Sequence, residues 1–206
     1  PAARKPGRDP ARRGRPPRAG PRQSPEQRDQ LHADFTEQIN KCRNEHEAWA
    51  MKHEHLVTHA LTLTFDISHL WNTLRKVNIT KPLNHPDVLE LLHGSMRYFK
   101  WKLDKSLYGN RRGNILFVPV LEGLNDGQKP HYHCLLGVGE DRFDVVESKV
   151  KAIWADSPFG GHQVVVKPYR DHGWVGYTTK NALFANRESI DWMNVLLPTC
   201  SPSPAE

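Results

Sequence analysis

The chain has 206 residues, a formal net charge of +6 and three cysteines, and this length suits one folded domain with flanking segments. Because Cys42, Cys134 and Cys200 form no C-x-x-C pair, the sequence argues against a zinc ribbon and against a secreted disulfide framework. No stretch approaches the roughly 18 apolar residues that span a bilayer, and the first residues lack an apolar signal segment, so we expect a cytoplasmic protein with no membrane partner.

Residues 1–25 form a basic leader that contains a single acid, Asp9, and many prolines and glycines. Such a composition has too few large apolar side chains to build a core, so we expect this leader to be disordered. Two interpretations stay open, a flexible arm that binds phosphates or a solvated segment without a role. Its basic residues are Arg4, Lys5, Arg8, Arg12, Arg13, Arg15, Arg18 and Arg22.

Residues 26–58 predict a helical extension of the domain. Most of them are polar and compatible with a helix, and four apolar residues recur at helical spacing. We therefore expect a helix that packs on the outside of the domain through this stripe and carries no chemistry. The stripe consists of Leu31, Phe35, Ile39 and Cys42.

Six segments within residues 59–197 carry the periodicity of a strand or of a helix. Strands are indicated by alternating or β-branched apolar residues, and helices by apolar residues three and four positions apart. The Asp126-Gly127 pair is typical of a hairpin turn. In chain order we expect a strand at 60–66, a helix at 87–108, strands at 114–122 and 131–138, a helix at 144–154 and a strand at 161–167.

This order of elements is typical of a split βαβ arrangement, also called ferredoxin-like or RRM-like. We therefore expect an α+β domain over residues 59–197, with an antiparallel sheet, helices on one of its faces and the other face free to bind a ligand. A short helix at 174–185 and a flexible tail at 198–206 complete the prediction.

The pair His131 and His133 is the first candidate for chemistry. In a strand, both imidazoles lie on the same face, and two neutral imidazoles aimed at one point can bind a metal ion. With twelve histidines in the chain, about one such pair is expected by chance. The second pair, His53 and His55, lies in a charged segment expected to be helical, where residues two apart diverge, so we interpret it as a surface pair.

Glu122 ends the strand that precedes this pair, on the other side of the predicted hairpin. Two histidines and one carboxylate form a ligand set that leaves open positions on Mg²⁺ or Mn²⁺. The alternatives are that Glu122 is an exposed acid at a strand end, or that the histidines belong to a structural zinc site. Such a zinc site needs four protein ligands, and Cys134 alternates away from both histidines.

The segment Gly176-Tyr177-Thr178-Thr179-Lys180 is the second candidate. Residues three apart share a helix face, and a lysine cation beside a tyrosine favours the phenolate and balances phosphate charge. We therefore take Tyr177 as the candidate nucleophile and Lys180 as its partner. Tyr169 is a weaker candidate because it follows Lys167-Pro168, where the backbone is pushed away from helix.

Together these motifs resemble those of the HUH endonucleases, and more narrowly the single-tyrosine rolling-circle replication initiators (Rep type). The resemblance covers about residues 61–185. Leu61-Thr62-Leu63-Thr64-Phe65 resembles the first-strand motif, and Pro130-His131-Tyr132-His133 with Glu122 resembles the metal motif. Gly176-Tyr177-Thr178-Thr179-Lys180 resembles the nucleophile motif.

The resemblance implies a nuclease that nicks and rejoins single-stranded or hairpin origin DNA of a plasmid or phage. A metal ion on Glu122, His131 and His133 would polarise the scissile phosphate, and attack by Tyr177 would leave a 5′-phosphotyrosine link. The free 3′-hydroxyl would prime a host polymerase. Because the chain has no G-x-x-x-x-G-K-[ST] loop, unwinding would require a host helicase.

Two alternatives stay open within this resemblance. A single-strand transposase of the same superfamily shares the order of the motifs but usually has a glutamine or similar group where this chain has Lys180. A catalytically idle DNA-binding module could use the same fold. The chain also departs from the viral relatives in its arginine-rich leader and in having no second tyrosine one helical turn from Tyr177.

Two sets of residues remain ambiguous. Arg111, Arg112, Lys167 and Arg170 either line the path of the DNA or are ordinary solvated charges. We expect the tryptophans to lie in the core rather than to stack on bases; these are Trp71, Trp101, Trp154, Trp174 and Trp192.

Overall fold

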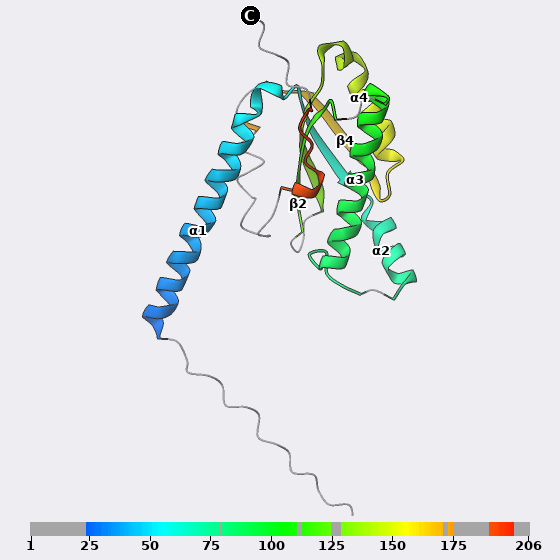
Figure 1. Ribbon diagram of the computed structural model, residues 1–206. Coiled ribbons are helices and arrows are strands. Elements are labelled where there is room, and N and C mark those ends of the chain that lie inside the picture. The colour runs from blue at the N-terminus through cyan, green and yellow to red at the C-terminus, as the bar shows by residue number, and fades with distance from the viewer. Residues whose placement is uncertain are drawn as a thin grey trace, which may run out of the picture. The chain divides into compact units, whose positions relative to one another are not determined.

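The computed structural model describes residues 24–78, 80–110, 113–124, 129–170, 173–174 and 190–199 (Figure 1), without the side chains of Arg28, His32 and Ile39. Contacts divide the chain into two units, Pro1–Gln38 and Ile39–Glu206. None of the helices in these ranges is both long and apolar enough to cross a membrane.

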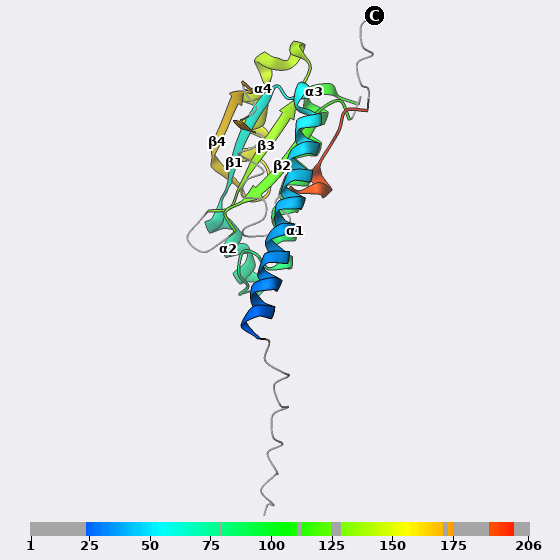
Figure 2. The same ribbon diagram turned by 90° about the vertical axis from the view of Figure 1, so that its left-hand side faces the viewer.

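The described elements confirm an α+β architecture with a four-stranded antiparallel sheet. The strands lie in the order β2-β3-β1-β4, seen side by side in Figure 2. The helices are α1 (Pro25–Lys52), α2 (Ile67–Lys76), α3 (Pro86–Tyr108) and α4 (Phe143–Ala155). The strands are β1 (His59–Phe65), β2 (Leu116–Glu122), β3 (His131–Gly137) and β4 (Gly160–Pro168), and the 3₁₀ turns are η1 (Glu54–Leu56), η2 (Glu140–Arg142) and η3 (Trp192–Asn194).

With α2 set aside, the chain runs β1-α3-β2-β3-α4-β4, which is the split βαβ order that the sequence predicts. Within the described residues, the six predicted strands and helices of the domain agree with the observed ones within two residues at each end, and the predicted N-terminal helix is observed as α1, which ends at Lys52. Helix α2 was not predicted. It begins after Asp66, whose carboxylate accepts a hydrogen bond from the His69 backbone N–H at 2.9 Å, and it buries Leu70 and Leu74.

The main core fills the space between one face of the sheet and helices α3 and α4. Alternate residues of each strand point into it, because side chains in a strand alternate between the two faces. Trp154 of α4 is fully buried there, and its indole N–H donates to the Thr64 carbonyl at 2.8 Å. The sheet contributes Leu61, Leu63, Phe65, Phe117, Leu121, Tyr132, Cys134 and Leu136.

The opposite face of the sheet is not free over its whole width, which corrects the expectation from the sequence. A second apolar cluster covers it on the side of β2, where the packed residues include Trp49 and Ala50 of α1 and Ile190. The physical reason is that Leu116 to Leu121 are apolar at every position, so both faces of β2 need cover. On the side of β1 and β4, Val165 of this face is 43% exposed.

Helix α1 confirms the predicted helix. Its last turns pack on the domain, where Ala50 is buried and Trp49 packs against the second cluster. The predicted stripe begins at Leu31 and Phe35 in the other unit, and its packing stays a prediction.

Residues 190–199 run along the outer edge of β2. Phe117 and Leu196 exchange two backbone hydrogen bonds of 2.8 and 2.9 Å, and the Asp191 N–H donates to the Pro119 carbonyl at 2.9 Å. Pro119 has no N–H to offer, and it stands where the backbone faces this edge rather than β3. At the end of this segment, Thr199 bonds the Gly113 carbonyl through its backbone N–H at 2.8 Å.

Candidate metal centre

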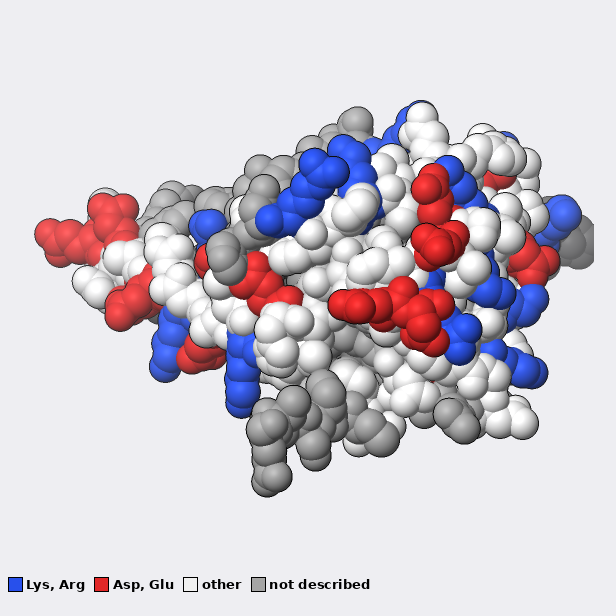
Figure 3. Space-filling view, turned by 90° about the horizontal axis from the view of Figure 1, so that it is seen from above, with Lys and Arg blue, Asp and Glu red and all other residues white. Residues whose placement is uncertain are grey.

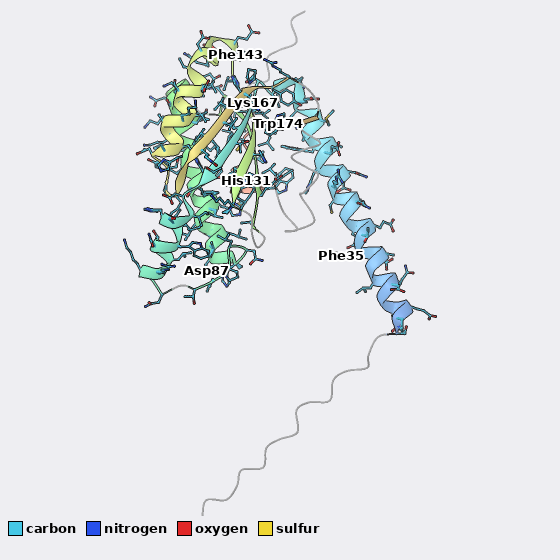
Figure 4. All side chains as sticks on the ribbon, turned by 180° about the vertical axis from the view of Figure 1, so that it is seen from behind. Phe35, Asp87, His131, Phe143, Lys167 and Trp174 are labelled. Carbon is cyan, nitrogen blue, oxygen red and sulfur yellow. The ribbon has the colours of Figure 1, made fainter. Side chains whose placement is uncertain are left out.

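Strand pairing brings Glu122, His131 and His133 to one point on the open side of the sheet. Glu122 of β2 stands directly opposite His131 of β3, and His133 follows two residues along the same strand. All three side chains therefore lie on the face turned away from α3 and α4. Figure 4 labels His131 on this face.

The ligand atoms of these residues all lie within 4.8 Å of one another. The two Nε2 atoms are 3.2 Å apart, and Oε2 of Glu122 lies 3.7 Å from Nε2 of His131 and 3.8 Å from Nε2 of His133. Neighbouring ligands around Mg²⁺ or Mn²⁺, each about 2.1 Å from the ion, are about 3 Å apart. The three residues thus fit an ion with little movement, and they leave other coordination positions open.

Hydrogen bonds hold both imidazoles with Nε2 turned toward this point. Nδ1 of His131 lies 2.9 Å from the Lys129 carbonyl, which can only accept, so Nδ1 carries the proton and Nε2 offers a lone pair. Nδ1 of His133 lies 3.1 Å from the Thr62 hydroxyl on β1. Partners of this kind are typical of metal-bound histidines, whose second nitrogen bonds a carbonyl, carboxylate or other polar group.

The surroundings also favour the protonation states that a metal ion requires. Burial, followed by the proximity of His131, lowers the pKa of His133 from 6.5 to about 4, so this ring is neutral at pH 7. The Glu122 side chain is 9% exposed, whereas that of His131 is 25% exposed. Solvent therefore reaches the His131 side chain more easily than that of Glu122.

Cys134 takes no part in this centre. It is fully buried in the core on the other face of the sheet, as its position next to His133 predicts. Among the described residues, the group of Glu122, His131 and His133 is the one cluster with metal-binding geometry. Within the part of the chain that the structure describes, three protein ligands thus converge here, whereas a closed structural zinc site has four.

A buried polar network anchors the residue between the two histidines. The Tyr132 hydroxyl donates to Oδ2 of Asp191 at 2.9 Å and lies 3.0 Å from Nδ1 of His93. Nδ1 of His93 is 2.7 Å from the same carboxylate oxygen, and the Asn194 amide donates to it at 2.6 Å. The network ties β3 to α3 and to the segment after residue 189.

Charge within this network is stabilised by hydrogen bonds. Burial alone would raise the pKa of Asp191, but hydrogen bonds from His93, Asn194 and Tyr132 outweigh it and hold the pKa below its usual value. Burial and the nearby Asp191 carboxylate raise the pKa of Tyr132 well above 10.0, so its hydroxyl remains a donor. Sequence reasoning missed His93, Asp191 and Asn194, because no local pattern connects residues so far apart in the chain.

Tyr177 and Lys180 lie outside the described residues, as does the predicted helix at 174–185 beyond Trp174. The described Trp174 stands at the metal centre. Its ring centroid is 5.3 Å from that of His133, with an angle of 74° between the planes, and its side chain is partly exposed.

The other expectations on aromatic residues and histidines have mixed outcomes. Trp154 is a core residue as predicted, but Trp101 and Trp192 are 41% and 40% exposed, so the prediction was wrong for them. The pair His53 and His55 forms no metal cluster in the described part of the chain, and Nδ1–H of His53 donates to the Trp49 carbonyl. The Tyr169 hydroxyl donates to Glu54.

Figure 3 shows acidic and basic side chains interspersed over the face of the molecule that is seen from above. Comparison with family models, with curated proteins and with solved structures gives no match for this chain.

Proposed function

We propose that this chain is a metal-dependent HUH endonuclease that nicks and rejoins single-stranded DNA, as a replication initiator of the rolling-circle type does. The observation that carries the proposal is the convergence of Glu122, His131 and His133, with both histidines oriented by second hydrogen bonds. The split βαβ order, with the histidine pair on an inner strand, supports an HUH nuclease fold. Tyr177 is the proposed nucleophile and Lys180 its partner.

The donor set suits a hard divalent cation such as Mg²⁺ or Mn²⁺, which when bound would act as a Lewis acid on the scissile phosphate. Glu122, His131 and His133 would hold the cation in front of the open half of the sheet. Thr62 and the Lys129 carbonyl keep the two imidazole rings turned toward the cation position.

The covalent step exchanges one phosphodiester for another. The Tyr177 oxygen loses its proton to solvent and forms a bond to phosphorus, while the bond from phosphorus to the 3′-oxygen breaks and that oxygen takes up a proton. The product is a 5′-phosphotyrosine and a free 3′-hydroxyl. Because a phosphoester replaces a phosphoester, the step needs no ATP and can run backwards to rejoin the strand.

The proposal is tested with the full chain, Mn²⁺ and a library of random-sequence single strands labelled at the 3′ end. Wild type should produce a labelled band that survives SDS, and chelation or Tyr177→Phe should abolish it. Tyr169→Phe is the matched control and should retain the band, because that hydroxyl donates to Glu54. A band that persists in Tyr177→Phe, or no band with wild type, contradicts the proposal.

A further inference from the structure

The described residues cover the sheet face around His133 more on one side than on the other, and the less covered side, at Thr62 and Val165, is called the open half. On the side of β2, the second apolar cluster covers it. On the side of β1, the partner of His133 is Thr62, and the next strand places Val165 directly opposite Thr62. Val165 is 43% exposed.

Trp174 and Lys167 flank this open half. Trp174 contacts His133 with ring centroids 5.3 Å apart. Lys167 is exposed and lies on the same face as Val165, two residues along β4. Figure 4 labels Trp174, Lys167 and His131 on the view of this side of the sheet. An aromatic ring thus contacts the candidate metal centre, an exposed apolar residue lies two strands from His133 on the same face, and a cation lies two residues farther along β4.

This combination matches the chemistry of a single-stranded nucleic acid. Such strands are bound by aromatic rings that stack on bases and by cations that follow the phosphates. Neighbouring nucleotides in a stacked strand are about 3.4 Å apart, so a ring 5.3 Å from His133 is within one or two nucleotides of a phosphate at the metal centre. A duplex offers no free base faces to such a ring.

We propose that Trp174 stacks on the base of a nucleotide next to the scissile phosphate and that Lys167 neutralises a phosphate of the same strand. The proposal rests on the proposed function, which supplies the DNA substrate. It assigns the open half of the sheet, from Thr62 to Val165, as the path of that strand. Trp174 is a substrate-binding residue in this assignment, and its contact with His133 places the base relative to the metal centre.

The experiment compares two labelled probes in EDTA, an oligothymidylate of about 15 nucleotides and an abasic strand with the same phosphates. Wild type should bind oligothymidylate more tightly than the abasic strand, by about 5- to 150-fold, which corresponds to about 1–3 kcal/mol for one stacked base. Trp174→Ala should remove that preference, and Trp174→Phe should restore part of it. Trp101→Ala is the control, because Trp101 is an exposed tryptophan that lies on α3 rather than at the metal centre.

Lys167→Ala should weaken binding of both probes equally and reduce the salt dependence by about one phosphate contact. Lys151→Ala, on α4, is its matched control and should change neither. The affinity for Mn²⁺ shows whether Trp174 stacks on a base or only holds His133 in place. If Trp174 stacks on a base, Trp174→Ala should keep the affinity for Mn²⁺ within about twofold of wild type. A base preference that survives Trp174→Ala, or a loss of Mn²⁺ affinity with the base preference intact, overturns the proposal.

These outcomes are independent of nicking, because EDTA prevents it. If the base preference depends on Trp174 but wild type forms no covalent adduct, the proposed nicking function is contradicted and Trp174 is still a base-stacking residue. If the adduct forms but Trp174→Ala keeps the base preference, only the role assigned to Trp174 is contradicted.

Discussion

Glu122 faces His131 across the β2-β3 ladder, and its carboxylate oxygen lies 3.7 Å from the Nε2 atom of that histidine. This proximity depends on the pairing of β2 with β3, and neither strand alone determines it. The register of the hairpin brings the carboxylate to a pair of imidazoles that are already aimed at one point by Lys129 and Thr62. The candidate centre is thus a product of strand pairing, and each contact within it can be removed separately.

Glu122→Gln should abolish most binding of Mn²⁺, because an amide oxygen carries no charge to neutralise the ion. We expect a loss greater than the roughly 10- to 100-fold typical of an outer hydrogen-bond partner. Titration calorimetry with Mn²⁺ measures it. Glu147→Gln, an exposed residue of α4, is the control, and equal affinities for the two variants would show that Glu122 is not a ligand.

Thr62→Val should weaken Mn²⁺ binding about 10- to 100-fold, because it removes the hydroxyl beside Nδ1 of His133 while keeping the shape of the side chain. Thr64→Val is a close control on the same strand face, since that hydroxyl donates to the Gln163 carbonyl instead. A Thr62→Val protein with wild-type affinity would mean that His133 is oriented without this contact.

Tyr132→Phe should lower the free energy of unfolding by about 1–3 kcal/mol, because the buried Asp191 carboxylate loses one of its donors. Urea unfolding measures the change. Tyr98→Phe removes an exposed hydroxyl that bonds Asp156 and should cost less. If both variants are equally stable, the network around Asp191 does not contribute to stability through Tyr132.

The pH dependence of stability should contain a contribution from His133. The fold lowers the pKa of this ring from 6.5 to about 4, so between these values the unfolded chain binds more protons than the folded one. Stability therefore rises with pH through this window and falls as the pH drops from 6.5 toward 4. Unfolding measured in EDTA should show a flatter profile for His133→Asn than for wild type, and equal slopes for the two proteins would contradict this contribution.

The local patterns of the sequence were sufficient for most elements and for the hairpin. Apolar residues that recur with a period of two or of three to four decide which face of a strand or helix is buried, and that information lies within one segment. A short connection makes β2 and β3 neighbours, so the sequence alone is enough to group Glu122, His131 and His133. Helix α2 was missed although Asp66 provides a typical cap.

Only the tertiary structure decided which groups surround that hairpin. Thr62 reaches His133 because β1 pairs with β3, and Asp191 reaches Tyr132 because a distant segment runs along the edge of β2. Contacts between residues so far apart depend on packing, which no periodicity encodes. The second apolar cluster on β2 also depends on such packing. The sequence of β2 is apolar on both faces and so indicates that both faces are buried, but it does not indicate which segments bury them.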